Sequence, residues 1–168
     1  YWMHNGYMNI KGEKMSKSVG NIVLARELTE KYPAEVIRLF VLSAHYRGPL
    51  DFTFEALEKI KNAYREIYYT MQRLDRLGVK SAAENRVFAD KFSEALDDDF
   101  NTPKAIAEIF NAVNEVKKVL NTGRGVDVMK KLSGLAAELT EMLGVLKIDP
   151  VTEPVDKAVS DMARSCLL

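Results

Sequence analysis

The chain has 168 residues, 47% of them hydrophobic, which is enough for one domain or two small domains with a real core. Its 24 basic and 24 acidic residues give zero net charge, which argues against a protein coated in positive charge for nonspecific nucleic-acid binding. The single cysteine excludes an intrachain disulfide and a zinc site made of cysteines, and no apolar run reaches the roughly 18 residues of a transmembrane helix.

The N-terminal residues indicate a fragment of a cytoplasmic protein. The chain opens with Tyr1 and Trp2 instead of an initiator methionine, and it lacks the charged and apolar regions of a signal peptide. A reduced, cytoplasmic setting fits this composition best. Because an aromatic start would be costly to expose, we expect other residues to precede it. Residues 1–23 are expected to form an extended or strand-like piece followed by a polar loop.

The polar loop at residues 12–21 has the composition of a phosphate-binding segment. Lys14 and Lys17 lie three positions apart and can both reach one polyphosphate. Serine hydroxyls and backbone N–H groups can complete the cradle, and Gly20 relieves steric limits where the backbone turns. Short basic loops are common, however, so composition by itself favours a solvated loop without a function.

Helical periodicity begins after the loop. Pro33 suits the first turn of a helix over 33–42, whose apolar positions 36, 37, 40 and 41 share one face. A turn-rich break is predicted at 45–51. Apolar residues then recur every three or four positions and predict a long helix over 54–77, which Gly78 would end.

Three more amphipathic helices are predicted, over 87–96, 103–120 and 126–143. Three acids at 97–99 would oppose the dipole at the end of the first of these helices and so mark its end. Thr102 would cap the next helix, with Pro103 as its first residue. Four amphipathic helices with short connections imply a mainly α fold with an antiparallel bundle.

Four stretches of the sequence form an ordered set of motifs. They are residues 1–6 (YWMHNG), 14–18 (KMSKS), 43–47 (SAHYR) and 97–103 (DDDFNTP). They are sensibly spaced and extend over the first two-thirds of the chain. Residues 14–18 spell the complete KMSKS signature of class I aminoacyl-tRNA synthetases, and the four stretches together resemble the cysteinyl-tRNA synthetase family of that class.

The resemblance implies a mainly α fold in three parts. Residues 1–50 would be the end of a class I catalytic domain, with the KMSKS loop and the stem-contact region. Residues 51–147 would be an antiparallel helical bundle of the DALR type, and 148–168 a linker and truncated C-terminal segment. The chain would then be a C-terminal fragment, and no anticodon recognition is assigned to it.

The resemblance also implies an activity for the full-length enzyme, cysteine–tRNA ligase. That enzyme would activate cysteine with ATP and transfer it to tRNA(Cys). Lys17 is the position that the family assigns to ATP, and Lys14 assists at the same phosphates as the second catalytic residue. Met15, Ser16 and Ser18 would complete the ATP-binding loop. Two ammonium groups that close on the departing pyrophosphate stabilise the transition state more than the ground state. The isolated chain is expected to be inactive.

The cofactors implied are ATP with Mg²⁺, together with the family's zinc ion, which selects the cysteine thiolate. The chain has neither the His-Ile-Gly-His nucleotide signature nor a Cys, His and Glu cluster, so no residue is assigned to a metal. His4 and His45 lack a partner at metal-ligand spacing. We expect His4 to support the packing of the loop and His45 to make a local hydrogen bond. The expected partners of the full-length enzyme are tRNA(Cys), cysteine and ATP. No contact with a membrane is expected.

Basic residues beyond the loop are candidates for contact with the tRNA backbone. The candidates are Arg47, Lys59, Lys61 and Arg65, followed by Arg73 and Arg76. Each alone fits a solvated charge on an amphipathic helix, and only the implied tRNA makes the group a candidate. The acids at 97–99 lack the oxygen spacing of a calcium loop, so we expect them to cap, turn or pair with a neighbouring base.

Two alternatives stay open. A cysteine ligase of the mycothiol pathway resembles the synthetase and shares its loop chemistry, although the stretches at 45–47 and 97–103 favour the synthetase. A standalone helical tRNA-binding or protein-interaction module would keep its binding when Lys14 and Lys17 are both replaced by alanine.

Overall fold

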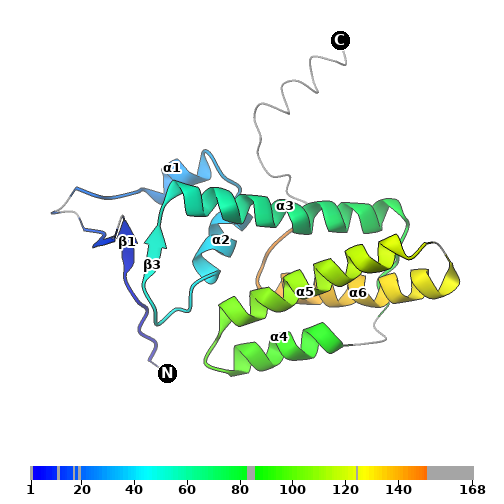
Figure 1. Cartoon of the computed structure of the whole chain (residues 1–168). Helices are drawn as coiled ribbons and strands as arrows, with labels where there is room; N and C mark the ends of the chain where they lie inside the picture. The colour runs from blue at the N-terminus through cyan, green and yellow to red at the C-terminus, as the bar shows by residue number, and fades with distance from the viewer. Residues whose placement is uncertain are drawn as a thin grey trace, which may run out of the picture.

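A small sheet and a helical bundle make up the protein, described here by a computed structural model (Figure 1). The structure describes residues 2–10, 12–16, 18, 20–82, 86–123 and 125–150. The elements are β1 (Met8–Ile10), β2 (Glu13–Lys14), α1 (Ala25–Thr29), α2 (Ala34–Leu42), β3 (Leu50–Phe52), α3 (Phe54–Arg76), α4 (Val87–Asp97), α5 (Thr102–Asn121) and α6 (Val126–Val145). The mainly α fold is confirmed. The predicted domain limits, 1–50, 51–147 and 148–168, stay predictions, and residues 151–168 lie outside the described ranges.

The sheet has the strand order β2-β1-β3. Strand β1 pairs antiparallel with β2, which places Asn9 opposite Lys14, and parallel with β3, which places Met8 opposite Leu50. A parallel pair needs a crossover connection, and here it contains α1 and α2. The strand-like start of the chain was expected. The prediction of a break over 45–51 was wrong at its end, because β3 forms only by pairing with a distant strand.

Helix α2 begins one residue later than predicted and buries a different face. Pro33 is its N-cap, with φ −56° and ψ 147°, and not its first helical residue. Val36, Leu39 and Phe40 are buried, whereas Val41, expected on the inner face, is 48% exposed. The ring of Phe40 packs edge-on against an aromatic ring of β3, with centroids 5.7 Å apart. The inner face is set by these contacts with β3 and α3 together, which periodicity alone does not contain.

Helices α3 to α6 form the predicted antiparallel bundle, in which successive helices run in opposite directions (Figure 1). The hydroxyl of Thr53 accepts a hydrogen bond from the Ala56 N–H at 3.0 Å and caps α3. Gly78 follows the end of α3 with φ +67°, as its predicted role requires. Helix α5 is capped by Asn101, whose side chain accepts from the N–H of Lys104 at 3.2 Å. The predicted cap, Thr102, is instead the first helical residue.

The core lies where α3, α5 and α6 meet. Tyr64, Ile109 and Leu139 come from these three helices, and each is 0% exposed. A fully buried side chain of this kind stabilises a fold by roughly 1.5–3 kcal/mol. The Tyr64 hydroxyl donates to the carbonyl of Asp149 at 2.8 Å and ties the chain beyond α6 to α3.

Within the described ranges, no helix combines the length and apolar character needed to cross a bilayer.

Candidate functional site

The KMSKS loop leaves the sheet from the end of β2. The Met15 N–H donates to the carbonyl of Met8 at 2.9 Å, so the hairpin contact continues one residue past β2. Gly20 brings the chain back with φ +72°, a conformation that favours glycine. Asn21 then bonds both to the Ser16 N–H, at 2.9 Å, and to the Lys14 carbonyl, at 3.3 Å. The start of the loop is therefore held by the sheet on one side and by Asn21 on the other.

Lys14 presents its ammonium group at the surface of this hairpin. The side chain is exposed, and its Nζ lies 3.6 Å from the centre of the Tyr7 ring. A cation–π contact at an exposed site contributes about 0.5–1 kcal/mol. A polyphosphate offers the ammonium several charged oxygens, and hydrogen bonds to such oxygens are stronger than this cation–π contact. A phosphate contact can therefore replace it.

The other predicted ATP-binding residues are only partly described. Met15 is half-buried, and Ser16 and Ser18 place their hydroxyl oxygens 3.1 Å apart. Lys17, the other predicted catalytic residue, lies outside the described residues. The structure therefore brings Lys14, Met15, Ser16 and Ser18 to one short loop, and the role of Lys17 stays a prediction.

Two of the stretches singled out in the sequence meet at a joint between the sheet and the bundle. The Asp99 carboxylate accepts hydrogen bonds from the Arg47 guanidinium, at 3.0 Å, and from the Tyr46 hydroxyl, at 2.7 Å. It also forms an ion pair with Nε of Arg47 at 2.6 Å. These hydrogen bonds lower the pKa of the Asp99 carboxyl, and the bond from Arg47 has a larger effect than the bond from Tyr46. Asp99 and Phe100 have φ values of 54° and 52°, in the left-handed region. The predicted pairing of these acids with a base is confirmed for Asp99.

A glycine contact closes the same joint from the N-terminal side. The Gly6 N–H donates to the carbonyl of Tyr46 at 2.6 Å. A Cβ atom on Gly6 would lie 1.9 Å from the carbonyl oxygen of Gly48. Only a residue without a side chain allows this approach, which sets the segment leading into β1 against the turn that precedes β3.

The predicted tRNA-contacting residues differ in exposure. Lys59 is exposed, with its ammonium 3.2 Å from Glu55, and Arg65 is half-buried. Lys61 is only 9% exposed, and its ammonium lies 3.5 Å from a carboxylate oxygen of Glu58. The guanidinium of Arg47 is engaged by Asp99. Lys61 is thus the candidate least suited to a surface contact, since its charge is turned inward.

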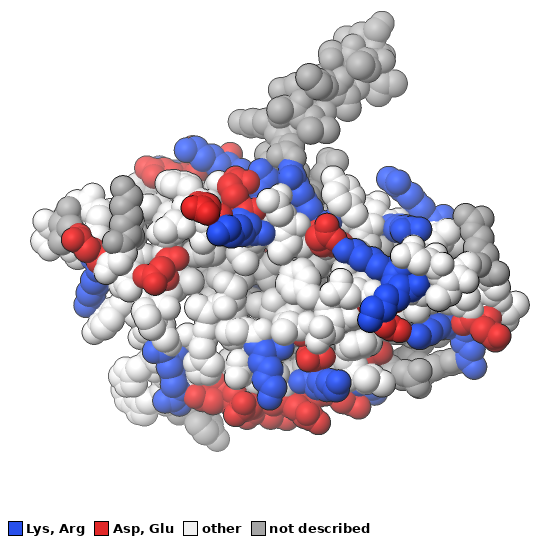
Figure 2. All heavy atoms as spheres, viewed as in Figure 1, with Lys and Arg blue, Asp and Glu red and all other residues white. Residues whose placement is uncertain are grey.

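The surface charges are mixed and form no broad basic face in the view of Figure 2, where blue and red side chains alternate. Acidic side chains gather along the lower edge, where α4 lies and carries Asp90, Glu94 and Asp97. This pattern agrees with the zero net charge of the chain. A nucleic-acid contact would have to be local and would lie away from the α4 edge.

The two histidines have separate surroundings. His45 Nδ1 accepts a hydrogen bond from the Arg47 N–H at 3.3 Å, which confirms the expected local bond. His4 is exposed on the extended N-terminal segment, so the packing role expected of it was wrong. In the part of the chain that the structure describes, no group of three or more His, Cys, Asp or Glu side chains could hold a metal ion.

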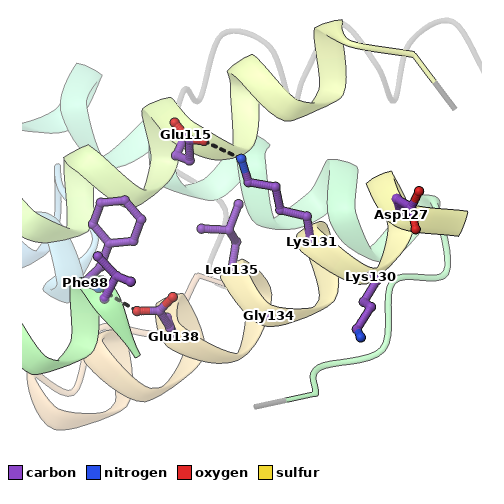
Figure 3. A pocket seen from close by; sticks show the side chains of 9 residues that line it. Phe88, Glu115, Asp127, Lys130, Lys131, Gly134, Leu135 and Glu138 are labelled. Atoms are coloured by element: carbon purple, nitrogen blue, oxygen red, sulfur yellow. Dashed lines mark hydrogen bonds and ion pairs between the residues drawn. The ribbon is translucent and has the colours of Figure 1, made fainter. Parts of the chain in front are cut away.

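An open pocket of about 530 Å³ lies at the surface of the bundle, between α4, α5 and α6 (Figure 3). At its edge, Glu138 of α6 is 4% exposed and accepts from the N–H groups of Phe88 and Ala89 at 2.6 and 2.9 Å. These are among the first N–H groups of α4, which has no side-chain cap of its own. Across the pocket, the Lys131 ammonium lies 2.8 Å from Glu115. Glu138, Lys131 and Glu115 therefore all have partners within the protein. We interpret the pocket as a feature of helix packing and not as a functional site.

Replacing Glu138 by alanine is expected to destabilise the chain by about 2–3 kcal/mol, because one part-buried and one buried N–H group lose a charged acceptor. Urea denaturation followed by circular dichroism would measure the loss. The matched control is Glu141→Ala, which removes the exposed pair that Arg86 makes at 2.8 Å and should cost no more than about 1 kcal/mol. Equal losses in the two variants would show that Glu138 does not act as the cap of α4.

Two protein-family models match the chain. Residues 1–62 match the model described as tRNA synthetases class I (C) catalytic domain, and residues 91–147 match the DALR domain. The first match contains the loop and the sheet. The second begins within α4 and ends just after α6.

The chain is also similar to curated proteins and to a solved structure. It is 40% identical over 158 residues to a cysteine–tRNA ligase of Geobacter metallireducens, an alignment that covers 87% of this chain and 33% of the relative. A cysteine–tRNA ligase of Halorhodospira halophila is 40% identical over 154 residues, with coverage of 89% and 32%. The chain spans about a third of the length of these relatives. The solved structure is LeuRS of Agrobacterium radiobacter K84 in a ternary complex with tRNA and LeuAMS. The match covers 84% of this chain and 20% of the LeuRS chain, with a TM-score of 0.66. Since the sequences are 20% identical, this likeness concerns the fold alone.

Proposed function

Because the chain belongs to the cysteine–tRNA ligase family of class I tRNA synthetases, we propose that it works as part of a ligase that activates cysteine with ATP and transfers it to tRNA(Cys). The observation that carries the proposal is the KMSKS loop, which presents the Lys14 ammonium on a hairpin fixed to the sheet. The isolated chain is expected to be inactive, since its sequence does not contain the His-Ile-Gly-His nucleotide signature.

In this proposal Lys14 and Lys17 hold the β- and γ-phosphates of ATP as the cysteine carboxylate attacks the α-phosphorus. Negative charge builds on the departing pyrophosphate, and two ammonium groups stabilise that charge most strongly in the transition state. Met15, Ser16 and Ser18 would supply the rest of the ATP-binding loop. ATP is expected to bind as its Mg²⁺ complex, with no metal ligand assigned to this chain.

The substrate specificity can be tested with a chimaeric ligase, in which this chain replaces the matching third of the Geobacter metallireducens relative. We expect the chimaeric ligase to charge tRNA(Cys) with cysteine and to leave an amino-sugar acceptor unreacted. The assay supplies labelled cysteine with each acceptor. Ligation to the amino sugar without charging of tRNA would favour the cysteine ligase of the mycothiol pathway instead.

The tRNA contact is proposed for the exposed side of α3, with Lys59 and Arg65 as the main candidates and Arg47 at the joint. Phosphate contacts dominate such binding and make it dependent on salt. Lys61 is expected to contribute less, because its side chain is nearly buried and its ammonium is paired with Glu58.

Lys59→Glu is expected to weaken binding of tRNA(Cys) by the chimaeric ligase several-fold. It should also reduce the slope of log K against log salt by about one, the signature of one lost phosphate contact. Filter binding at several salt concentrations would measure both values. Lys91→Glu, on the acidic α4 edge, is the control and should change neither. An unchanged salt slope in Lys59→Glu would exclude this residue from the tRNA contact.

A further inference from the structure

The side chain of Asn21 bridges the two backbone groups that flank Met15. Its Oδ1 accepts from the Ser16 N–H at 2.9 Å, and its Nδ2 donates to the Lys14 carbonyl at 3.3 Å. An amide side chain is suited to this bridge, because it carries an acceptor and a donor on one planar group. Gly20 makes the bridge possible, since its φ of +72° turns the chain back toward the start of the loop.

The bridge completes a set of three bonds on three consecutive residues. The Met15 N–H is already bonded to the carbonyl of Met8 in β1, at 2.9 Å. With the Asn21 bonds added, the Lys14 carbonyl, the Met15 N–H and the Ser16 N–H are all held. Since Lys14 also lies opposite Asn9 in the sheet, the backbone from which its long side chain extends has a fixed position.

From this geometry we infer that Asn21 is a positioning residue for the adenylation step. It acts through the backbone of residues 14–16 and need not touch the substrate. The inference rests on the proposed function, in which Lys14 must meet the pyrophosphate in the transition state. A displacement of about 1 Å in a group of this kind can lower a rate on the order of 10²-fold, although the group is still present.

Asn21→Ala removes both bonds, and its effect can be measured in the chimaeric ligase. We expect the kcat of cysteine-dependent ATP–pyrophosphate exchange to fall roughly 10- to 100-fold. The KM for cysteine and the rate of transfer from preformed cysteinyl adenylate should stay within about twofold of the unmodified protein, since neither depends on pyrophosphate. Asn114→Ala, on the exposed side of α5, is the matched control and should leave all three values unchanged.

Two results in the ligase would overturn the inference. One is a kcat of exchange within twofold of the unmodified protein. The other is an equal fall in exchange and in transfer, which would indicate general damage. Asn21→Asp keeps the acceptor for Ser16 but turns a carboxylate oxygen toward the Lys14 carbonyl, so full activity of that variant would also contradict a two-bond bridge.

A second measurement does not depend on enzymatic activity. In the 168-residue chain, Asn21→Ala should speed amide hydrogen exchange at Ser16 several-fold. The Met15 amide, bonded to Met8, should keep its protection and serves as the internal control. Unchanged exchange at Ser16 would overturn the bridge. Absence of pyrophosphate exchange by the unmodified chimaeric ligase would instead contradict the proposed function, and amide exchange would then test the Asn21 bridge alone.

Discussion

Replacing Lys14 and Lys17 together by alanine is expected to lower the kcat of cysteine-dependent ATP–pyrophosphate exchange by at least about 10³ in the chimaeric ligase. One preorganised donor to developing charge contributes about 10²–10³ in rate, and two donors on the same phosphates act as a unit. Lys14 is exposed and lies outside the core, so circular dichroism should show an unchanged fold. The measurement is isotope exchange between labelled pyrophosphate and ATP.

The matched control for this double variant replaces two exposed lysines by alanine: Lys80, which follows α3, and Lys91 of α4. It removes the same charge from the chain and should leave exchange within about twofold. If the Lys14 and Lys17 variant exchanged at the unmodified rate, the loop would have no part in activation.

Gly6→Ala is expected to separate the segment leading into β1 from the turn at residues 45–48. The new Cβ atom would lie 1.9 Å from the Gly48 carbonyl oxygen and 2.4 Å from its carbonyl carbon. These are backbone atoms, so no side-chain rotation can relieve the overlap. Overpacking usually costs about 1–3 kcal/mol, and we expect a value at the upper end. Amide exchange in β1 would show the loss directly, with the bundle amides unaffected.

A second glycine provides the control for this variant. Gly144 lies in α6, and a Cβ atom there would meet nothing within 4 Å. Gly144→Ala should therefore stabilise the chain, by up to about 1 kcal/mol, through helix propensity. If Gly6→Ala left the amides of β1 as protected as before, the contact between Gly6 and Gly48 would not be needed to hold the sheet.

The long helices could be predicted from sequence because their signals are local. Apolar residues recur at helical spacing along α3, α5 and α6, and Gly78 ends α3 where expected. Strand β3 could not be predicted in this way, since its three residues pair with a strand about forty positions earlier. The buried face of α2 was misjudged for a similar reason, as β3 and α3 together decide that Leu39 is buried and Val41 is not.

The functional residues show the same difference between local signals and contacts that only folding creates. The KMSKS signature identified Lys14 and its neighbours from contiguous residues. Asn21 was not singled out, because its role depends on the turn at Gly20 that brings it back to Ser16. The partner of Asp99 was predicted only as a nearby base, and folding supplied Arg47 from 52 positions away. Glu138 left one signal in the sequence, an acid on the apolar face of α6.

The adenylation and transfer steps of the chimaeric ligase, measured separately in single turnovers for Lys14→Ala, test the central claim most directly. If the loop acts on the pyrophosphate of ATP, adenylate formation should slow by about 10²–10³. Transfer of cysteine from preformed adenylate to tRNA(Cys) should keep its rate, because no pyrophosphate takes part in it. A loss shared equally by both steps, or confined to transfer, would contradict the account.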